Sequence, residues 1–180
     1  MYLSKVVVGS HDSYEQHQAI WTLFGGTPGR TRDHLFRVEA RDSGQCTLLL
    51  QSSTLPESSD DARVLISKEF YPGVSEESHY KFKLVGYPTK CLSQGKKVVE
   101  IKDSGEQVEW LQRKLSGANI QVTAMEELMV KSKKIFNSRF VCFEGILQVH
   151  DPEQIERALV MGVGRKKHAG AGLLSLARIS

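Results

Sequence analysis

The order of hydrophobic and polar residues at the start of the chain predicts a strand followed by a helix. Residues 3–8 form a short apolar run rich in β-branched side chains, which is typical of a strand. Ser13 and Gln16 then have the spacing of a capping box, in which side chains bond the free N–H groups of a helix start. Apolar residues continue to about Phe24, and the glycines and proline of residues 25–30 end the helix.

Three more strands are predicted in the first half of the chain. The runs 35–40 and 46–52 lie on either side of a turn and predict a β-hairpin. Residues 54–61 are rich in proline, serine and aspartate and leave room for one helical turn at most. Residues 64–71 return to strand character, so this half is predicted to fold as βαββ(α)β.

The pattern starts again after a linker-like segment at residues 72–77. Ser104 and Gln107 form a second capping box, and Asp151 followed by Pro152 is typical of a helix N-cap and first helical position. These two helices alternate with four predicted strands, at residues 80–85, 120–125, 140–149 and 173–177. The second half therefore has the order βαββαβ.

Two successive units of this kind predict an α+β protein with two tandem ferredoxin-like domains, at residues 1–74 and 78–180. Each domain is expected to have an antiparallel sheet with helices on one face, as RNA-recognition modules do. Because this topology serves many functions, particular residues have to indicate which function this chain has.

Composition permits several partners and favours one compartment. The net charge of +3 allows a polyanionic partner without requiring one. Cys46, Cys91 and Cys142 lack metal-binding spacing and lie in apolar or strand-like stretches, which predicts reduced core residues in a cytoplasmic protein. The sequence shows neither a signal peptide nor a long apolar span, so we expect a soluble, unexported protein without a membrane partner.

The first predicted helix carries residues suited to acid-base chemistry. Tyr14, His17 and Trp21 have the spacing of one helical stripe. A histidine titrates near neutral pH, so it can take a proton from an RNA 2′-hydroxyl or give one to a departing 5′-oxygen. The alternative is an exposed histidine beside a packed tryptophan, and spacing alone leaves both interpretations open.

No metal or cofactor is expected. The other histidines, His11, His34, His79, His150 and His168, have no spacing typical of a zinc site. The acidic pairs Asp60-Asp61 and Glu126-Glu127 lie in polar stretches, which is typical of solvated surface.

Two basic segments of the second half are candidates for contact with nucleic acid. Residues 131–139 combine four cations with an aromatic residue, and residues 162–172 combine three cations with four glycines. Basic loops of this kind suit an RNA backbone, although a solvated hairpin tip and a flexible turn explain them equally well. The cations are Lys131, Lys133, Lys134, Arg139, Arg165, Lys166 and Lys167.

Seven segments, in order, resemble the CasE-type CRISPR-associated endoribonucleases of type I-E Cascade. They are residues 1–8, 14–24, 36–39, 49–52, 110–115, 141–145 and 162–176. The resemblance implies two ferredoxin-like domains, in agreement with the repeated pattern. It also implies binding of the CRISPR repeat hairpin and metal-independent cleavage of pre-crRNA at the 3′ side of the stem. The products would be a 5′-hydroxyl and a 2′,3′-cyclic phosphate, with the crRNA kept in complex with other Cascade subunits.

The resemblance also implies roles for individual residues. His17 corresponds to the family's catalytic histidine in the H-Q-x-x-W stretch, and Tyr14 to its supporting tyrosine. Lys166 or Lys167 would neutralise phosphate charge. The basic residues of segment 131–139 correspond to a hairpin that grips the RNA stem.

Two other classes of protein compete with this interpretation. A catalytically inactive RNA-binding subunit would use the same surfaces and leave a bound repeat intact. A purely structural ferredoxin-like module would show no steep fall of RNA affinity with salt, whereas several phosphate contacts would produce one.

Overall fold

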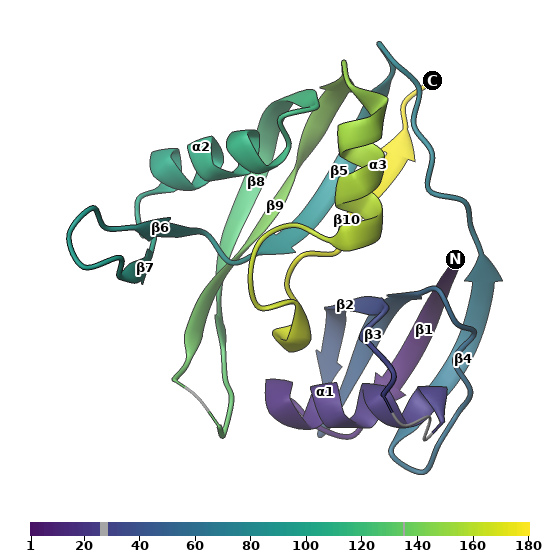
Figure 1. Cartoon of the computed structure of the whole chain (residues 1–180). Coiled ribbons are helices and arrows are strands. Elements are labelled where there is room, and N and C mark those ends of the chain that lie inside the picture. The colour runs from purple at the N-terminus through teal and green to yellow at the C-terminus, as the bar shows by residue number, and fades with distance from the viewer. Residues whose placement is uncertain (26–28, 135) are drawn as a thin grey trace. The chain divides into compact units, whose positions relative to one another are not determined.

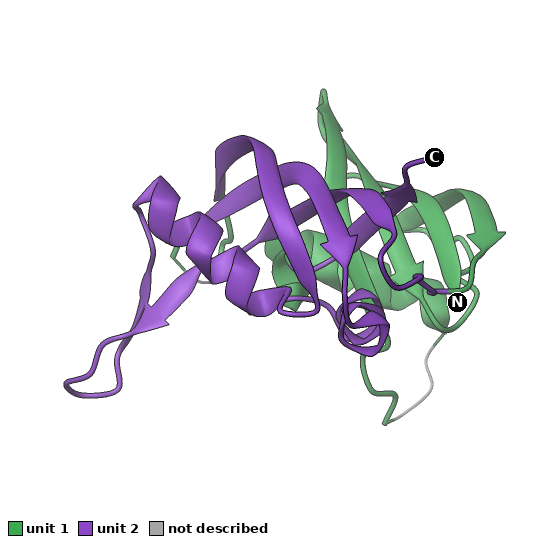
Figure 2. Ribbon diagram, turned by 90° about the horizontal axis from the view of Figure 1, so that it is seen from above, with its two compact units in different colours: residues 1–71, 130–138, 166–171 green, residues 72–129, 139–165, 172–180 purple. Residues whose placement is uncertain are grey.

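The computed structural model describes residues 1–25, 29–134 and 136–180, and these form two compact units (Figure 2). Unit 1 comprises Met1–Tyr71, Val130–Ser138 and Lys166–Ala171, and unit 2 comprises Pro72–Met129, Arg139–Arg165 and Gly172–Ser180. Two segments of the predicted C-terminal domain, the central parts of its basic loops, thus group with unit 1. Of the predicted helix-ending run at residues 25–30, residues 26–28 lie outside the described residues.

Unit 1 has a four-stranded antiparallel sheet in the order β2-β3-β1-β4 (Figure 1). Its strands are β1 (Tyr2–Val8), β2 (His34–Asp42), β3 (Gln45–Ser52) and β4 (Ala62–Glu69). Helix α1 (Ser13–Trp21) and the 3-10 turn η1 (Thr22–Phe24) follow β1. Residues 53–61 contain no helical turn, since this Pro- and Ser-rich segment lacks a run of helix formers.

Hydrophobic side chains that alternate with more exposed ones along the strands form the core of unit 1. Val6 and Val8 on β1 and Leu48 on β3 are buried, and they point to the same face of the sheet because side chains alternate along a strand. Ile20 of α1 and Leu23 of η1 complete this core from the helix. Fully burying an aliphatic side chain stabilises a fold by about 1.5–3 kcal/mol, so this packing fixes the helix against the sheet.

Unit 2 repeats the ferredoxin-like order, with strands β10-β5-β9-β8. Its strands are β5 (His79–Gly86), β8 (Ala118–Val130), β9 (Ser138–Val149) and β10 (Leu174–Arg178), with the ends of β8 and β9 at Val130 and Ser138 in unit 1. Helices α2 (Ser104–Lys114) and α3 (Pro152–Met161) bury Trp110 and Ile155 in the core of the sheet. The predicted fold of two antiparallel four-stranded sheets with helices is confirmed.

The helix starts differ from the predicted capping boxes by one residue. Asp12 rather than Ser13 is the N-cap of α1, and Asp103 rather than Ser104 is the N-cap of α2. An ionised carboxylate both accepts backbone N–H bonds and interacts favourably with the positive end of the helix dipole, so the aspartate is preferred to the serine that follows it. The predicted N-cap at Asp151 is confirmed.

One hairpin was missed by the sequence patterns. Strands β6 (Thr89–Cys91) and β7 (Val98–Glu100) pair as a separate two-stranded ribbon. Most of its residues are exposed, so no hydrophobic alternation marks it. Cys91 is exposed on β6, which corrects the prediction that all three cysteines belong to the core. The ribbon has no apolar face against which that thiol would be buried.

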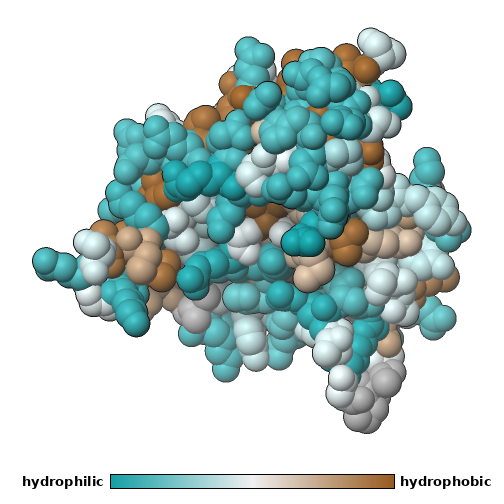
Figure 3. Space-filling model, turned by 45° about the horizontal axis from the view of Figure 1, so that its top comes forward, coloured by the Kyte–Doolittle hydropathy of each residue, from teal (hydrophilic) through white to brown (hydrophobic). Residues whose placement is uncertain are grey.

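Hydrophilic residues dominate the face drawn in Figure 3, where hydrophobic residues form small separate patches. The largest side chains of the two cores are buried, as the hydrophobic alternation predicts. Within the described parts of the chain, every helix is too short or too polar to cross a membrane.

Replacing Gly145 by alanine is expected to destabilise unit 2. A Cβ atom there would collide with the backbone oxygen of Gln121 and lie 2.9 Å from the Phe82 ring. Overpacking of this kind costs about 1–3 kcal/mol. The matched control is Gly9→Ala, whose Cβ would meet nothing within 4 Å. Urea unfolding followed by circular dichroism measures both, and equal midpoints would show that β9 accommodates the methyl group without cost.

Candidate active site

Helix α1 presents a mixed face of ionisable and aromatic side chains. Asp12 starts the helix, because its Oδ1 accepts hydrogen bonds from the backbone N–H groups of Tyr14 and Glu15, at 3.0 and 3.1 Å. Gln16 and Ile20 point inward and are buried, whereas Tyr14, His17 and Trp21 are half-buried. His17 therefore lies at the border between the core of unit 1 and its surface.

Residues 166–171, the part of the second basic segment that belongs to unit 1, pack against α1. It contains the 3-10 turn η2 (Lys167–Ala169), which brings the ring of His168 to 6.0 Å from the ring of His17, edge to face. Lys166 and Gly170 both have left-handed backbone at this turn. At Gly170 a Cβ would lie 3.2 Å from the Phe36 ring, so glycine lets the turn approach the sheet closely.

The electrostatic setting of both imidazoles favours their neutral forms. Burial lowers the pKa of His17 from its usual value, and the nearby charges of His168 and Arg32 lower it further. Burial also lowers the pKa of His168, with Arg32 and Lys166 acting in the same direction. An anion placed beside the two rings would oppose these effects and favour protonation.

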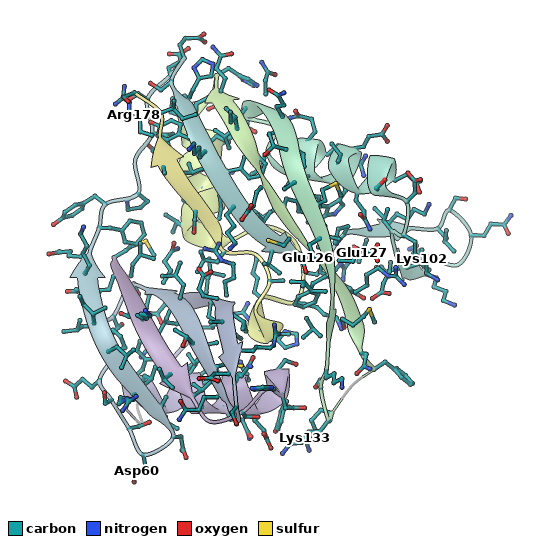
Figure 4. The ribbon with its side chains drawn as sticks, turned by 180° about the vertical axis from the view of Figure 1, so that it is seen from behind. Asp60, Lys102, Glu126, Glu127, Lys133 and Arg178 are labelled. Atoms are coloured by element: carbon teal, nitrogen blue, oxygen red, sulfur yellow. The ribbon has the colours of Figure 1, made fainter. Side chains whose placement is uncertain are left out.

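The first basic segment contacts the start of α1 through Lys131 and Lys133. The backbone N–H of Ser13 donates to the Lys131 oxygen (3.1 Å), and the Lys133 N–H donates to Asp12 Oδ2 (2.7 Å). Lys133, which Figure 4 shows at the end of the β8–β9 hairpin, also places its Nζ 2.6 Å from Glu15 Oε1. This ion pair lowers the pKa of Glu15, helped by a hydrogen bond from Ser10.

Two lysines approach the α1 site from different segments. The Nζ of Lys134 lies 5.2 Å from the centre of the Tyr14 ring, within the range of a cation-π interaction. The Nζ of Lys166 donates to the Ser138 Oγ (2.6 Å), which links the two basic segments. The Tyr14 hydroxyl accepts from the side-chain amide of Gln18 at 3.2 Å.

Most of the predicted residues belong to unit 1, and two of them belong to unit 2. Tyr14, His17 and five of the lysines belong to unit 1, in α1 or in the two segments packed on it; the lysines are Lys131, Lys133, Lys134, Lys166 and Lys167. Arg139 and Arg165 belong to unit 2. Arg139 bonds Glu127 at 2.9 Å, and Arg165 lines a hollow together with Lys90, Arg113 and Lys114.

Two residues of the site were not found from the sequence. His168 lies next to His17, but 151 positions along the chain separate them, so no local spacing indicates that they meet. The charge of Arg32 lowers the pKa of both imidazoles, and Arg32 precedes β2 in a segment without a regular pattern. The three cations before His168 were the available signal, since they marked its loop as a place where phosphate is held. Among the described residues, no group of three or more His, Cys, Asp or Glu side chains is arranged to hold a metal ion.

His34 of β2 is a buried histidine that packs beneath the C-terminal end of α1, against Trp21 and Phe24. It is 4% exposed, stacks on Phe24 with ring centres 5.4 Å apart, and meets the Trp21 ring at 5.1 Å. Neither of its ring nitrogens has a hydrogen-bond partner among the described residues. Burial is the largest cause that lowers the pKa of His34, to about 4, so the ring is neutral in the folded protein at neutral pH.

Comparison with known proteins agrees with this architecture. The family model described as CRISPR associated protein matches residues 1–178. The chain is 33% identical over 197 residues to the CRISPR system Cascade subunit CasE of Escherichia coli (strain K12), covering 98% of this chain and 99% of the relative. It is 32% identical over 188 residues to the CRISPR-associated endoribonuclease Cse3 of Thermus thermophilus, covering 91% and 89%. A structure of CRISPR endoribonuclease Cse3 bound to 19 nt RNA has 30% identity and a TM-score of 0.81, covering 98% of this chain and all of that one.

The fold and the site define a tandem ferredoxin-like protein whose α1 surface combines imidazoles with lysines. This combination suits chemistry on a polyanion. The chain belongs to the family of CRISPR-associated proteins and, within that family, is of the CasE type. The resemblance inferred from the seven sequence segments is confirmed.

His34→Phe is expected to reduce the loss of stability in acid. The folded pKa of His34 is about 4 and the unfolded value about 6.5, so the unfolded chain binds more protons between these values. Stability attributable to this residue is present above pH 6.5 and decreases as the pH falls toward 4, by on the order of 3 kcal/mol. Urea unfolding at a series of pH values measures the slope for wild type and variant.

The control for this measurement is His150→Gln, which changes an exposed histidine of unit 2. His17 and His168 contribute in the same direction in all three proteins, so the difference isolates His34. An identical acid slope in wild type and His34→Phe would contradict a neutral, buried His34.

Asp12→Ala is expected to destabilise the protein more than Asp103→Ala does. Both aspartates are N-caps, and losing a cap costs about 1 kcal/mol. Asp12 additionally accepts the Lys133 N–H, so its loss removes a further hydrogen bond worth about 0.5–1.5 kcal/mol. Urea unfolding of the two variants gives the comparison. Equal losses would mean that the bond to the first basic segment contributes nothing.

Proposed function

We propose that this chain is a metal-independent endoribonuclease of the cytoplasm. It binds the stem-loop of the CRISPR repeat, cleaves pre-crRNA at the 3′ side of the stem, and remains bound to the crRNA as a subunit of Cascade. The observation that carries the proposal is the position of His17, half-buried on α1 with Tyr14 on the same helix and two lysine-bearing segments packed around it. The RNA bound to Cse3, a relative of known structure, supports the substrate class.

The reaction is an attack of the RNA's own 2′-oxygen on the neighbouring phosphorus. A proton leaves the 2′-hydroxyl as the 2′-oxygen bonds to phosphorus, and the bond from phosphorus to the 5′-oxygen breaks as that oxygen gains a proton. The products are a 2′,3′-cyclic phosphate and a 5′-hydroxyl. His17 transfers one of these two protons: its lowered pKa favours the neutral ring, which can accept a proton, and a phosphate bound beside it favours the protonated ring, which can give one.

Tyr14 and the lysines prepare the RNA for this step. The Tyr14 hydroxyl, three residues before His17 on the same helix, orients a hydroxyl or phosphate oxygen at the site of cleavage. Lys166 and Lys167 in the segment facing α1 offset the charge that develops on the phosphate. Holding the 2′-oxygen in line with the leaving oxygen supplies much of the remaining rate enhancement.

The other predicted cations bind parts of the RNA away from the cleaved bond. Lys131, Lys133 and Lys134 belong to the segment beside α1, while Arg139 and Arg165 belong to unit 2. We assign all five to the RNA backbone. Arg139 would exchange its bond with Glu127 for a phosphate, and Lys133 its ion pair with Glu15. Such surface pairs contribute about 0–1 kcal/mol, so the exchange costs little.

His17→Ala is expected to lower the rate of cleavage about 10²- to 10⁴-fold, the usual contribution of a placed proton-transfer group. The measurement is single-turnover cleavage of a labelled CRISPR-repeat hairpin by excess protein in EDTA. Affinity for the uncut RNA is measured separately and should stay close to that of the wild type, because the lysines remain. His150→Ala serves as the control, since it removes an exposed imidazole from unit 2.

Other outcomes separate the competing classes of protein. If the wild type binds a matched repeat and leaves it intact, the chain is a catalytically inactive RNA-binding subunit. If cleavage stops in EDTA, metal independence is wrong. RNA affinity that barely changes with salt concentration would indicate a structural module, because several phosphate contacts make binding steeply salt-dependent.

A further inference from the structure

His168 is held in front of His17 by the fold of its own segment. The backbone N–H groups of Ala169 and Ala171 donate to the Lys166 oxygen, at 3.0 and 3.3 Å, and close a tight turn around His168. The Nζ of Lys166 donates a hydrogen bond to the Ser138 Oγ, and Gly170 lies against the Phe36 ring. The turn is therefore defined by contacts on both sides of the histidine, so the distance of 6.0 Å between the two rings follows from the fold.

His168 belongs to neither hydrophobic core and makes no hydrogen bond to the described residues. Its side chain reaches the surface, although neighbouring atoms partly desolvate the ring. The charges that shift its pKa are Arg32 before β2 and Lys166 in its own segment. On α1, the ring of His17 lies against the ring of His168, and the charge of His17 in turn contributes to lowering the pKa of His34 on β2. Gathering cations and imidazoles in this way is unfavourable in the free protein and becomes favourable when a phosphate lies among them.

We propose that His168 is the second proton-transfer group of the cleavage reaction, opposite His17. This inference rests on the proposed ribonuclease function and deepens it. Transphosphorylation needs two proton transfers, on opposite sides of the phosphorus, and a single imidazole supplies only one of them at a time. Two imidazole rings with centres 6.0 Å apart leave room for the oxygens of one phosphodiester within hydrogen-bonding reach of both.

The two histidines divide the step as follows. One imidazole, neutral at the start, accepts the proton of the 2′-hydroxyl as the 2′-oxygen bonds to phosphorus. The other, protonated at the start, gives its proton to the 5′-oxygen as the bond to phosphorus breaks. At the end the two rings have exchanged their protonation states, and exchange with water restores them. The negative phosphate between the rings stabilises the protonated one.

The test compares His168→Ala, His168→Asn and His17→Ala in single-turnover cleavage with excess protein and EDTA. Two substrates are used: the repeat hairpin, and the same hairpin with sulfur replacing the 5′-bridging oxygen at the cleavage site. A thiolate leaves without being protonated, so the sulfur substrate no longer needs a general acid. His150→Ala is the control, and RNA affinity is measured for each variant.

We expect both His168 variants to cut the oxygen substrate at least about 10²-fold more slowly than the wild type, with little change in RNA affinity. The bell-shaped dependence of the wild-type rate on pH should lose one limb in the His168 variants and the other limb in His17→Ala. On the sulfur substrate, one of the two histidine variants should regain a rate near that of the wild type. The variant that recovers identifies the general acid, and the other histidine is the base.

Three results would overturn the inference, and each differs from failure of the proposed function. One is a rate within about threefold of the wild type for His168→Ala on the oxygen substrate. Another is a slow variant that keeps both limbs of the pH profile, since His168 would then only position the RNA. A third is recovery of both variants or of neither on the sulfur substrate. If the wild type itself cuts neither substrate, the ribonuclease function is wrong and the inference is wrong with it.

Discussion

The arrangement of the site depends on the carboxylate of Asp12. One of its oxygens accepts the first backbone N–H groups of α1, and the other accepts the backbone N–H of Lys133. A single side chain thus fixes where α1 begins and where the first basic segment lies against it. Because the carboxylate also faces the positive end of the helix dipole, it is favourably placed in the absence of any ligand. The lysines of that segment are therefore positioned before RNA arrives.

The charges of the site are arranged for a ligand and not for the stability of the free protein. Burial and neighbouring cations lower the pKa of His17 and of His168, so neither ring is favoured in its charged form until an anion binds. By contrast, Arg139 in unit 2 already has a carboxylate partner in Glu127. Under the proposed mechanism, the RNA phosphate supplies the negative charge that would favour protonation of one of the two imidazoles, so proton transfer would depend on bound RNA.

Sequence patterns predicted the elements that bury a hydrophobic face and failed where no such face exists. Strands such as β1 and β9 alternate clearly and were found, whereas the exposed β6–β7 ribbon has no pattern to detect. His17 was indicated by its helix, because local spacing determines which side chains share a helical face. His168 was missed because its neighbour is set by tertiary contacts of a glycine-rich turn. The predicted N-caps of α1 and α2 were wrong by one residue, because Asp12 and Asp103 compete with the serines that follow them, whereas Asp151 was predicted correctly.

Unit 1 is built from three separate stretches of the chain, so the site forms only when distant segments come together. The first 71 residues supply the sheet and helix α1 with His17, but residues 130–138 and 166–171 supply the lysines and His168. Bringing such distant segments together costs loop-closure entropy, which the packing of the intervening strands and helices has to offset. The two imidazoles therefore meet only when residues 166–171 are packed on α1. Under the proposed mechanism the proton-transfer pair has one member in each of two segments far apart in the chain, so the proposed chemistry depends on long-range packing and not on the helix of His17 alone.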